Sequence, residues 1–169
     1  MKNIELKIEG MTCAHCERTV EEAIREAGAV GKASRANGSA TVSYDETVVD
    51  LQKIREAIEE KLRLTRFAYD ALQADERFEL LDEPQLSVIA LRLRGREGEA
   101  ADQADRLNEE LMRRVNARGR VFLSSTRLDG RYVIRICVLS FRTHLDRVQD
   151  AVQALREEAT SLLADAPRS

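Results

Sequence analysis

Apolar and polar residues alternate at the start of the chain and then recur with a helical period. Residues 4–8 alternate apolar and charged side chains, which predicts a half-buried strand. An i, i+3, i+4, i+7 apolar stripe predicts a helix over Cys16–Ala27. Two more strands are predicted over Val30–Ala36 and Ala40–Tyr44, joined by the hairpin signal Asn37-Gly38. The first part of the chain therefore reads as strand, helix, strand, strand.

A second, long helix follows these elements. It is expected to begin near Val49, with Leu51, Ile54 and Ile58 on one face. No stop signal occurs before about Leu72, so we expect one continuous helix.

The rest of the chain carries a second set of strands and helices. Thr143 is the predicted N-cap of the last helix, Leu145 belongs to its inward face, and Gly119 is expected to end the helix before it. The predicted strands are Phe78–Leu81, Ser87–Arg94, Val121–Leu128 and Arg131–Leu139. The last two strands flank Asp129-Gly130, a two-residue hairpin turn. The predicted helices are Asp102–Ala117 and a segment from Thr143 to Leu163.

Both halves read as antiparallel sheets covered on one face by helices, which is an α+β fold. We expect two domains, residues 1–60 and residues 61–163, followed by a frayed tail over residues 164–169. The use of basic residues changes at the same place. Four of the five lysines precede residue 60, whereas Lys61 is accompanied by eighteen arginines.

Composition limits the class of protein. With 43% apolar and 34% charged residues and a net charge of -3, the chain is expected to be a soluble, cytoplasmic protein without a membrane span. Aromatic residues make up only 4%, and the arginines at positions 113, 114, 118, 120, 127 and 131 have acidic neighbours. We therefore expect a solvated charged surface and no nucleic-acid partner.

One motif in the sequence indicates a chemical function. Cys13 and Cys16 form a Cys-x-x-Cys pair where the first predicted strand gives way to a helix. The helix dipole and free N–H groups there stabilise thiolates, and two thiolates suit a soft ion such as Cu(I), Zn(II), Hg(II) or Cd(II). His15 between them is either a weak ligand that tunes the charge of the loop or an exposed residue without a role.

Two other interpretations of the cysteine pair stay open. A closed zinc site requires four ligands, for which Cys137 and His144 are the remaining candidates. We expect instead that Cys137 is a buried small residue and that His144 lies in the first turn of the last helix. A thioredoxin-type redox pair also occupies a strand-to-helix turn, although the chain after the motif lacks a parallel βαβ pattern.

Residues 1–60 resemble the heavy-metal-associated domain of copper chaperones and mercury-binding proteins. The resemblance lies in Ile8–Cys16, Val20–Ile24 and Ala40–Asp45. It implies a ferredoxin-like fold with a metal ion held by Cys13 and Cys16 and with Met11 packed in the core.

The sequence departs from this family after the second helix. A fourth strand usually follows there, but the helix continues through Lys61, which leaves the order βαββα. The missing strand would lie beside the first one, so the first strand becomes a sheet edge. We expect a second chain, as in a homodimer, or the C-terminal half to complete this edge.

Residues 60–160 resemble the C-terminal small domain of group II decarboxylases that use pyridoxal phosphate (PLP), of the aromatic-L-amino-acid type. The resemblance is carried by Ala74–Leu80, Leu91–Gly95, Leu107–Leu111 and above all Asn116–Arg135. In that family the lysine that binds the cofactor belongs to a large domain without counterpart here. We therefore expect no bound PLP, no catalytic residue and no enzymatic activity.

The resulting hypothesis is a protein that binds a soft metal, Cu(I) first and Zn(II) or Hg(II) next, and scavenges it or transfers it to a metal-transporting ATPase or another metal-accepting protein. The decarboxylase-like half would then be a scaffold. One alternative is a non-catalytic remnant or accessory subunit of a PLP-dependent decarboxylase. Another is a fusion in which neither ancestral function survives.

Overall fold

The computed structural model describes residues 1–9, 11, 14–84, 87–95, 98–138 and 143–165. The chain forms two compact units. The N-terminal unit comprises Met1–Arg66 with Pro84–Ser87 and Val138–His144, and the C-terminal unit comprises Phe67–Glu83, Val88–Cys137 and Leu145–Ser169. No helix in the described part of the chain is long and apolar enough to span a membrane.

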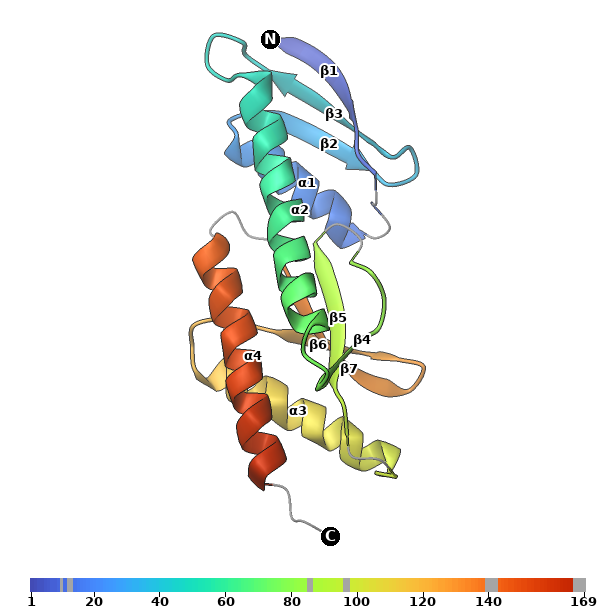
Figure 1. Cartoon of the computed structure of the whole chain (residues 1–169). Helices are drawn as coiled ribbons and strands as arrows, with labels where there is room; N and C mark the ends of the chain where they lie inside the picture. The colour runs from blue at the N-terminus through green and yellow to red at the C-terminus, as the bar shows by residue number, and fades with distance from the viewer. Residues whose placement is uncertain (10, 12–13, 85–86, 96–97, 139–142, 166–169) are drawn as a thin grey trace. The chain divides into compact units, whose positions relative to one another are not determined.

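The N-terminal unit holds a three-stranded antiparallel sheet in the order β1-β3-β2 (Figure 1). The order agrees with a ferredoxin-like sheet in which no strand among the described residues takes the fourth position next to β1, as the sequence predicts. Its strands are β1 (Lys2–Lys7), β2 (Val30–Ser34) and β3 (Ser39–Tyr44), and its helices are α1 (Ala14–Glu26) and the first part of α2 (Leu51–Gln73).

The core of this unit lies between the sheet and the helices. Its central side chains, Val20, Ile24, Val42 and Ile54, have essentially no exposed surface. Leu62 on α2 packs against this core but stays half-buried. The predicted apolar faces of both helices therefore point inward, and burial of these side chains stabilises the unit.

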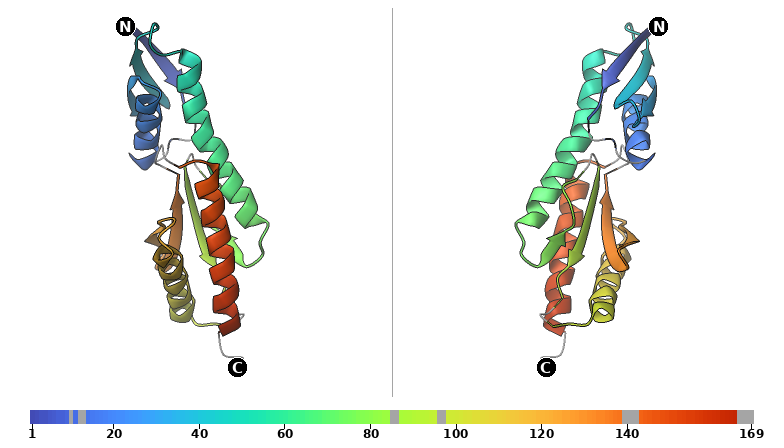
Figure 2. Two further views of the ribbon diagram at one scale, coloured as in Figure 1. Left: turned by 90° about the vertical axis from the view of Figure 1, so that its left-hand side faces the viewer. Right: turned by 90° about the vertical axis from the view of Figure 1, so that its right-hand side faces the viewer.

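Helix α2 is one continuous helix of 23 residues, as predicted (Figure 2). It begins at Leu51 rather than Val49 because Asp50 caps it. The Asp50 carboxylate accepts a hydrogen bond of 2.9 Å from the N–H of Gln52.

The first hairpin differs from the prediction. Strand β2 ends at Ser34, and Ser34 pairs with Ser39, so Arg35–Gly38 form a four-residue connection instead of a two-residue turn at Asn37-Gly38. Just beyond the end of β2, the Arg35 N–H donates to the Glu17 carboxylate at 2.9 Å.

The C-terminal unit holds a second antiparallel sheet, in the order β4-β5-β7-β6. Helix α3 packs on β5 and β7 and also contacts α4. The core includes Leu91, Leu111, Ile134 and Leu155, which have no exposed surface. The elements are β4 (Phe78–Leu80), β5 (Val88–Leu93), α3 (Ala101–Ala117), β6 (Ser124–Leu128), β7 (Arg131–Cys137) and α4 (Leu145–Asp165).

The second hairpin has the predicted two-residue turn. Leu128 pairs with Arg131, and both Asp129 (φ 50°) and Gly130 (φ 78°) adopt the left-handed backbone that a type I′ turn requires. Strand β6, however, begins at Ser124 and not at Val121. Just before β6, the Asn116 side chain accepts the N–H of Leu123 and donates to its C=O.

The last helix also differs from the prediction at both ends. Helix α4 begins at Leu145, so His144 precedes the helix, and Thr143 is too far from the first turn to be its N-cap. Leu145 is 46% exposed instead of inward, because it opens the helix. The helix runs to Asp165, two residues beyond the predicted end, and residues 166–169 lie outside the described part.

Candidate metal centre

The candidate site lies between the end of β1 and the start of α1. Helix α1 begins at Ala14, two residues earlier than predicted, so Cys16 occupies its first turn. Alanine is the best helix former, which favours this earlier start. The Cys16 side chain is 1% exposed and belongs to the same core as Val20 and Ile24.

Met11 is the one described residue of the loop between Glu9 and α1. This side chain is 7% exposed and packs in the core, the position that the family resemblance implies. Cys13, the other predicted ligand, lies outside the described residues, and of His15 only its place in α1 is described. Among the described residues no group of three or more His, Cys, Asp and Glu side chains could hold a metal ion.

The first turn of α1 is polar at its surface. Glu17 bonds the Arg35 N–H, and one turn later the Glu21 carboxylate accepts the Ala33 N–H at 3.1 Å. Both acidic side chains are thus engaged by the β2 hairpin. The helix N-terminus can therefore stabilise a thiolate while its nearest acidic groups are held by backbone donors.

A polar cluster that sequence reasoning missed surrounds Lys61. The Lys61 side chain is only 3% exposed, and its ammonium group donates to the Thr143 carbonyl at 3.2 Å and lies 3.5 Å from the Glu60 carboxylate. His144 Nδ1 lies 3.2 Å from the other oxygen of Glu60. The one feature of the sequence that pointed to this cluster was that Lys61 is the single lysine in a region rich in arginine.

Two carboxylates near Lys61 titrate away from their ordinary values. Burial alone would raise the pKa of Glu60, but the hydrogen bond with His144 and the charge of Lys61 outweigh it, and the pKa is lowered. For Glu26, burial dominates and raises the pKa, although the charge of Lys61 opposes it. Lys61 therefore favours the charged form of both carboxylates.

The structure also bears on the alternative interpretations. Every strand pairing among the described residues is antiparallel, which is unlike the parallel βαβ order of a thioredoxin-type protein. Cys137 is half-buried instead of buried, and its sulfur lies 3.9 Å from the Ser124 hydroxyl. His144 is paired with Glu60 as described above.

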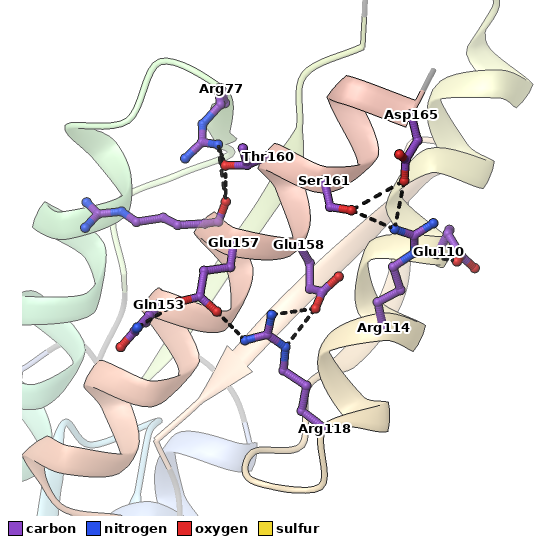
Figure 3. A network of polar contacts seen from close by, with 11 residues as sticks. Arg77, Glu110, Arg114, Arg118, Gln153, Glu157, Glu158, Thr160, Ser161 and Asp165 are labelled. Carbon is purple, nitrogen blue, oxygen red and sulfur yellow. Dashed lines mark hydrogen bonds and ion pairs between the residues drawn. The ribbon is translucent and has the colours of Figure 1, made fainter. Parts of the chain in front are cut away.

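The arginines that the sequence analysis singled out are paired with carboxylates. Arg118 contacts both Glu157 and Glu158 at 2.6 Å, and Arg114 bonds Glu110 at 2.8 Å (Figure 3). The partners of the other arginines singled out above are also acidic: Glu110 for Arg113, Asp150 for Arg120, Asp105 for Arg127 and Glu79 for Arg131.

Comparison with known families assigns the class of the N-terminal unit. Residues 5–62 match the model of the heavy-metal-associated domain. The match starts in β1 and ends at Leu62 inside α2, where the fourth strand of the fold would otherwise follow. The predicted resemblance is confirmed, and it supports heavy-metal binding by this part of the chain.

The remainder of the chain is similar to aromatic amino-acid decarboxylases. Tryptophan decarboxylase 1 of Oryza sativa subsp. japonica is 28% identical over 114 residues, which are 66% of this chain and 22% of that protein. Aromatic-L-amino-acid decarboxylase of Cavia porcellus is 32% identical over 92 residues, 54% of this chain and 18% of the enzyme.

Solved structures give the same result. The crystal structure of Oryza sativa TDC with PLP and tryptamine superposes with a TM-score of 0.62 at 26% identity, covering 66% of this chain and 23% of that one. The chain thus spans roughly a fifth of the length of the curated relatives it matches, such as the 22% of the rice enzyme. The second predicted resemblance is confirmed as well.

The residues present do not fit PLP. The cofactor is held in such enzymes by a Schiff base with an accessible lysine amine. Lys61 is the only lysine after residue 60, and its buried amine is bonded to the Thr143 carbonyl. The decarboxylase-like region is therefore similar to part of these enzymes, and its single lysine does not offer an accessible amine for the cofactor.

Proposed function

We propose that this protein captures a soft metal ion, Cu(I) first and Zn(II) or Hg(II) next, through Cys13 and Cys16. The observation that carries the proposal is the match of residues 5–62 to the heavy-metal-associated domain, with the Cys-x-x-Cys motif at its strand-to-helix junction. Two thiolates are a ligand set that selects such ions over Mg²⁺ or Ca²⁺.

The surroundings of Cys16 support a defined ligand position. Its side chain is held in the core together with Met11, so the sulfur is not free to rotate into solvent. A ligand fixed by packing loses little conformational entropy when the ion binds. Two sulfur ligands leave the ion open to attack by a third thiolate, which suits transfer to a metal-transporting ATPase or another acceptor in the cytoplasm.

Competition for Cu(I) against a chromophoric chelator tests metal capture. The wild-type protein should take one Cu(I) per chain with sub-micromolar affinity. Cys13→Ser combined with Cys16→Ser should abolish this binding, because a hydroxyl is a poor ligand for a soft ion. Cys137→Ser is the matched control and should leave the affinity unchanged.

Folding must be monitored in the same samples because Cys16 belongs to the core. Cys13→Ser alone alters no described core residue, and its loss of binding with an unchanged circular dichroism spectrum would support the proposal. A double variant that competes for Cu(I) as well as the wild-type protein would refute it.

A second candidate function follows from the similarity to the decarboxylases over 66% of the chain. As a non-catalytic accessory subunit, the chain would bind a decarboxylase and alter its activity without holding PLP itself. Decarboxylation assays with and without the added chain test this role. An absorbance band on adding PLP to the chain alone would contradict the absence of a cofactor-binding amine.

A further inference from the structure

The two edges of the N-terminal sheet are not equivalent. At the β2 edge, the outward N–H groups of Ala33 and Arg35 are occupied by the carboxylates of Glu21 and Glu17. At the other edge, β1 pairs with β3 on one side, and no strand in the described part of the chain pairs with its outer side. Of the two edges of the N-terminal sheet, as far as the structure describes it, β1 is therefore the one more open to another strand.

The backbone groups at this edge can be assigned. In an antiparallel ladder, alternate residues direct both their N–H and C=O groups to the partner strand. The Ile8 N–H donates to the Gly38 carbonyl at 2.8 Å, so the even-numbered residues of β1 face β3. The N–H and C=O groups of Asn3, Glu5 and Lys7 consequently point to the open edge.

A groove runs along the same edge. Its volume is about 420 Å³, and it lies between β1 and α2. Leu6, Ile8, Ile58 and Leu62 supply its apolar lining. A fourth strand of the ferredoxin-like fold would lie here, and the half-buried state of Leu62 reflects its absence.

We propose that a second copy of this chain occupies the edge, with the two β1 strands antiparallel and Leu6 of each copy on the two-fold axis. The argument is charge complementarity. In this register each Glu5 lies opposite Lys7 of the other copy, and each Ile4 lies opposite Ile8. Both pairs are favourable across an antiparallel ladder.

Dimers in the neighbouring strand registers would be less stable. A shift by two residues in one direction places Glu5 opposite Glu5 of the other copy. A shift by two residues in the opposite direction places Lys7 opposite Lys7. Like charges that face each other directly are destabilising. A shift by one residue turns Ile4 and Leu6 to the solvent face of the partner. The chosen register also makes Glu5 and Lys7 a hydrogen-bonded pair, in agreement with the direction of their backbone groups.

Charge reversal tests this dimer by sedimentation equilibrium, with reductant and chelator present so that neither disulfides nor metal ions link the chains. The wild-type protein should dimerise reversibly. Glu5→Lys and Lys7→Glu should each weaken the dimer at least tenfold, because each places like charges opposite one another twice. Lys53→Glu, on the exposed face of α2 and outside the groove, is the matched control and should have no effect.

Mixing the variants separates a specific contact from misfolding. An equimolar mixture of Glu5→Lys and Lys7→Glu should recover the dimer, because every opposed pair again joins opposite charges, and the chain with both substitutions should also dimerise. In amide hydrogen exchange, the Glu5 and Lys7 amides should gain protection with concentration.

A wild-type protein that stays monomeric would overturn the proposal and leave the edge to a strand of another protein. A dimer that Lys7→Glu weakens no more than Lys53→Glu would overturn it too, because the contact would then lie elsewhere.

Discussion

Asn108 shows how a residue that marks a family can have a structural role. It lies in one of the segments that resemble the decarboxylases, and it has no exposed surface. Its side-chain amide donates to the carbonyls of Leu93 and Ala104, and its oxygen accepts the N–H of Leu93 at 2.7 Å. Asn116 holds Leu123 in the same manner. The family resemblance in these segments therefore reports the fold and not the chemistry.

Asn108→Ala should destabilise the protein by about 3 kcal/mol, because it leaves the buried N–H and C=O of Leu93 without partners. Urea denaturation followed by circular dichroism measures the free energy of unfolding. Asn116→Ala removes an equivalent pair of bonds at a half-buried site, so it should cost about half as much. Equal costs for the two substitutions would contradict the importance of burial.

Helices α1 and α3 both end in a glycine with left-handed backbone. Gly28 (φ 89°) follows α1, where the Ala29 N–H donates to Ile24 and the Gly28 N–H donates to Arg25, as in a Schellman motif. Gly119 (φ 69°) follows α3. A Cβ at Gly28 would lie 2.8 Å from Val49 Cγ2, whereas a Cβ at Gly119 would meet nothing within 4 Å.

Gly28→Ala should therefore cost more than Gly119→Ala. Both substitutions pay about 1 kcal/mol for the left-handed conformation. Only Gly28→Ala adds a steric contact, which we expect to raise the total to about 2–3 kcal/mol. Thermal melts of the two variants make the comparison, and a larger effect at Gly119 would be inconsistent with the described packing.

The helices and strands show how much of the fold could be predicted from the sequence. Local signals were sufficient for the order of strands and helices, for the turn at Asp129-Gly130 and for the unbroken α2 helix. They failed at the end of β2 and the start of β6, where side chains of other elements bond the adjoining backbone, as Glu17 does at Arg35 and Asn116 does at Leu123. Such bonds depend on tertiary contact, which no periodicity reports.

The same distinction applies to the candidate site. The Cys-x-x-Cys motif and the missing fourth strand are local features, so the sequence alone was enough to predict both, although Cys13 lies outside the described residues. The Lys61 cluster was not, because Thr143 lies 82 positions further along the chain. Its formation requires the segment Val138–His144 to join the N-terminal unit, and contact between such distant segments leaves no periodic pattern.

At the scale of the whole molecule, ion pairs within helix α3 make stability depend on pH. Arg113 and Arg114 hydrogen bond the Glu110 carboxylate and lower its pKa from the ordinary 4.5 to about 2. A carboxylate whose pKa is lower in the folded state stabilises the protein above its unfolded pKa, and this contribution is lost as the pH falls through the folded pKa. Acid should therefore weaken the C-terminal unit between pH 4.5 and about 2.

Glu110→Gln should remove part of this dependence. Because the ion pairs are largely at the surface, we expect a loss of about 0.5–1 kcal/mol at neutral pH and no difference from the wild-type protein near pH 2. Unfolding free energies measured across this range test the prediction. A difference that persists at the lowest pH would show that charge is not its cause.

The central claim is that a pair of sulfur atoms from Cys13 and Cys16 holds a soft metal ion. X-ray absorption spectroscopy of the Cu(I)-loaded protein tests it most directly, because the spectrum identifies the atoms bound to copper. We predict a first shell of sulfur that disappears in the Cys13→Ser, Cys16→Ser double variant and persists in Cys137→Ser. A first shell of nitrogen or oxygen, or sulfur retained in the double variant, would contradict the account.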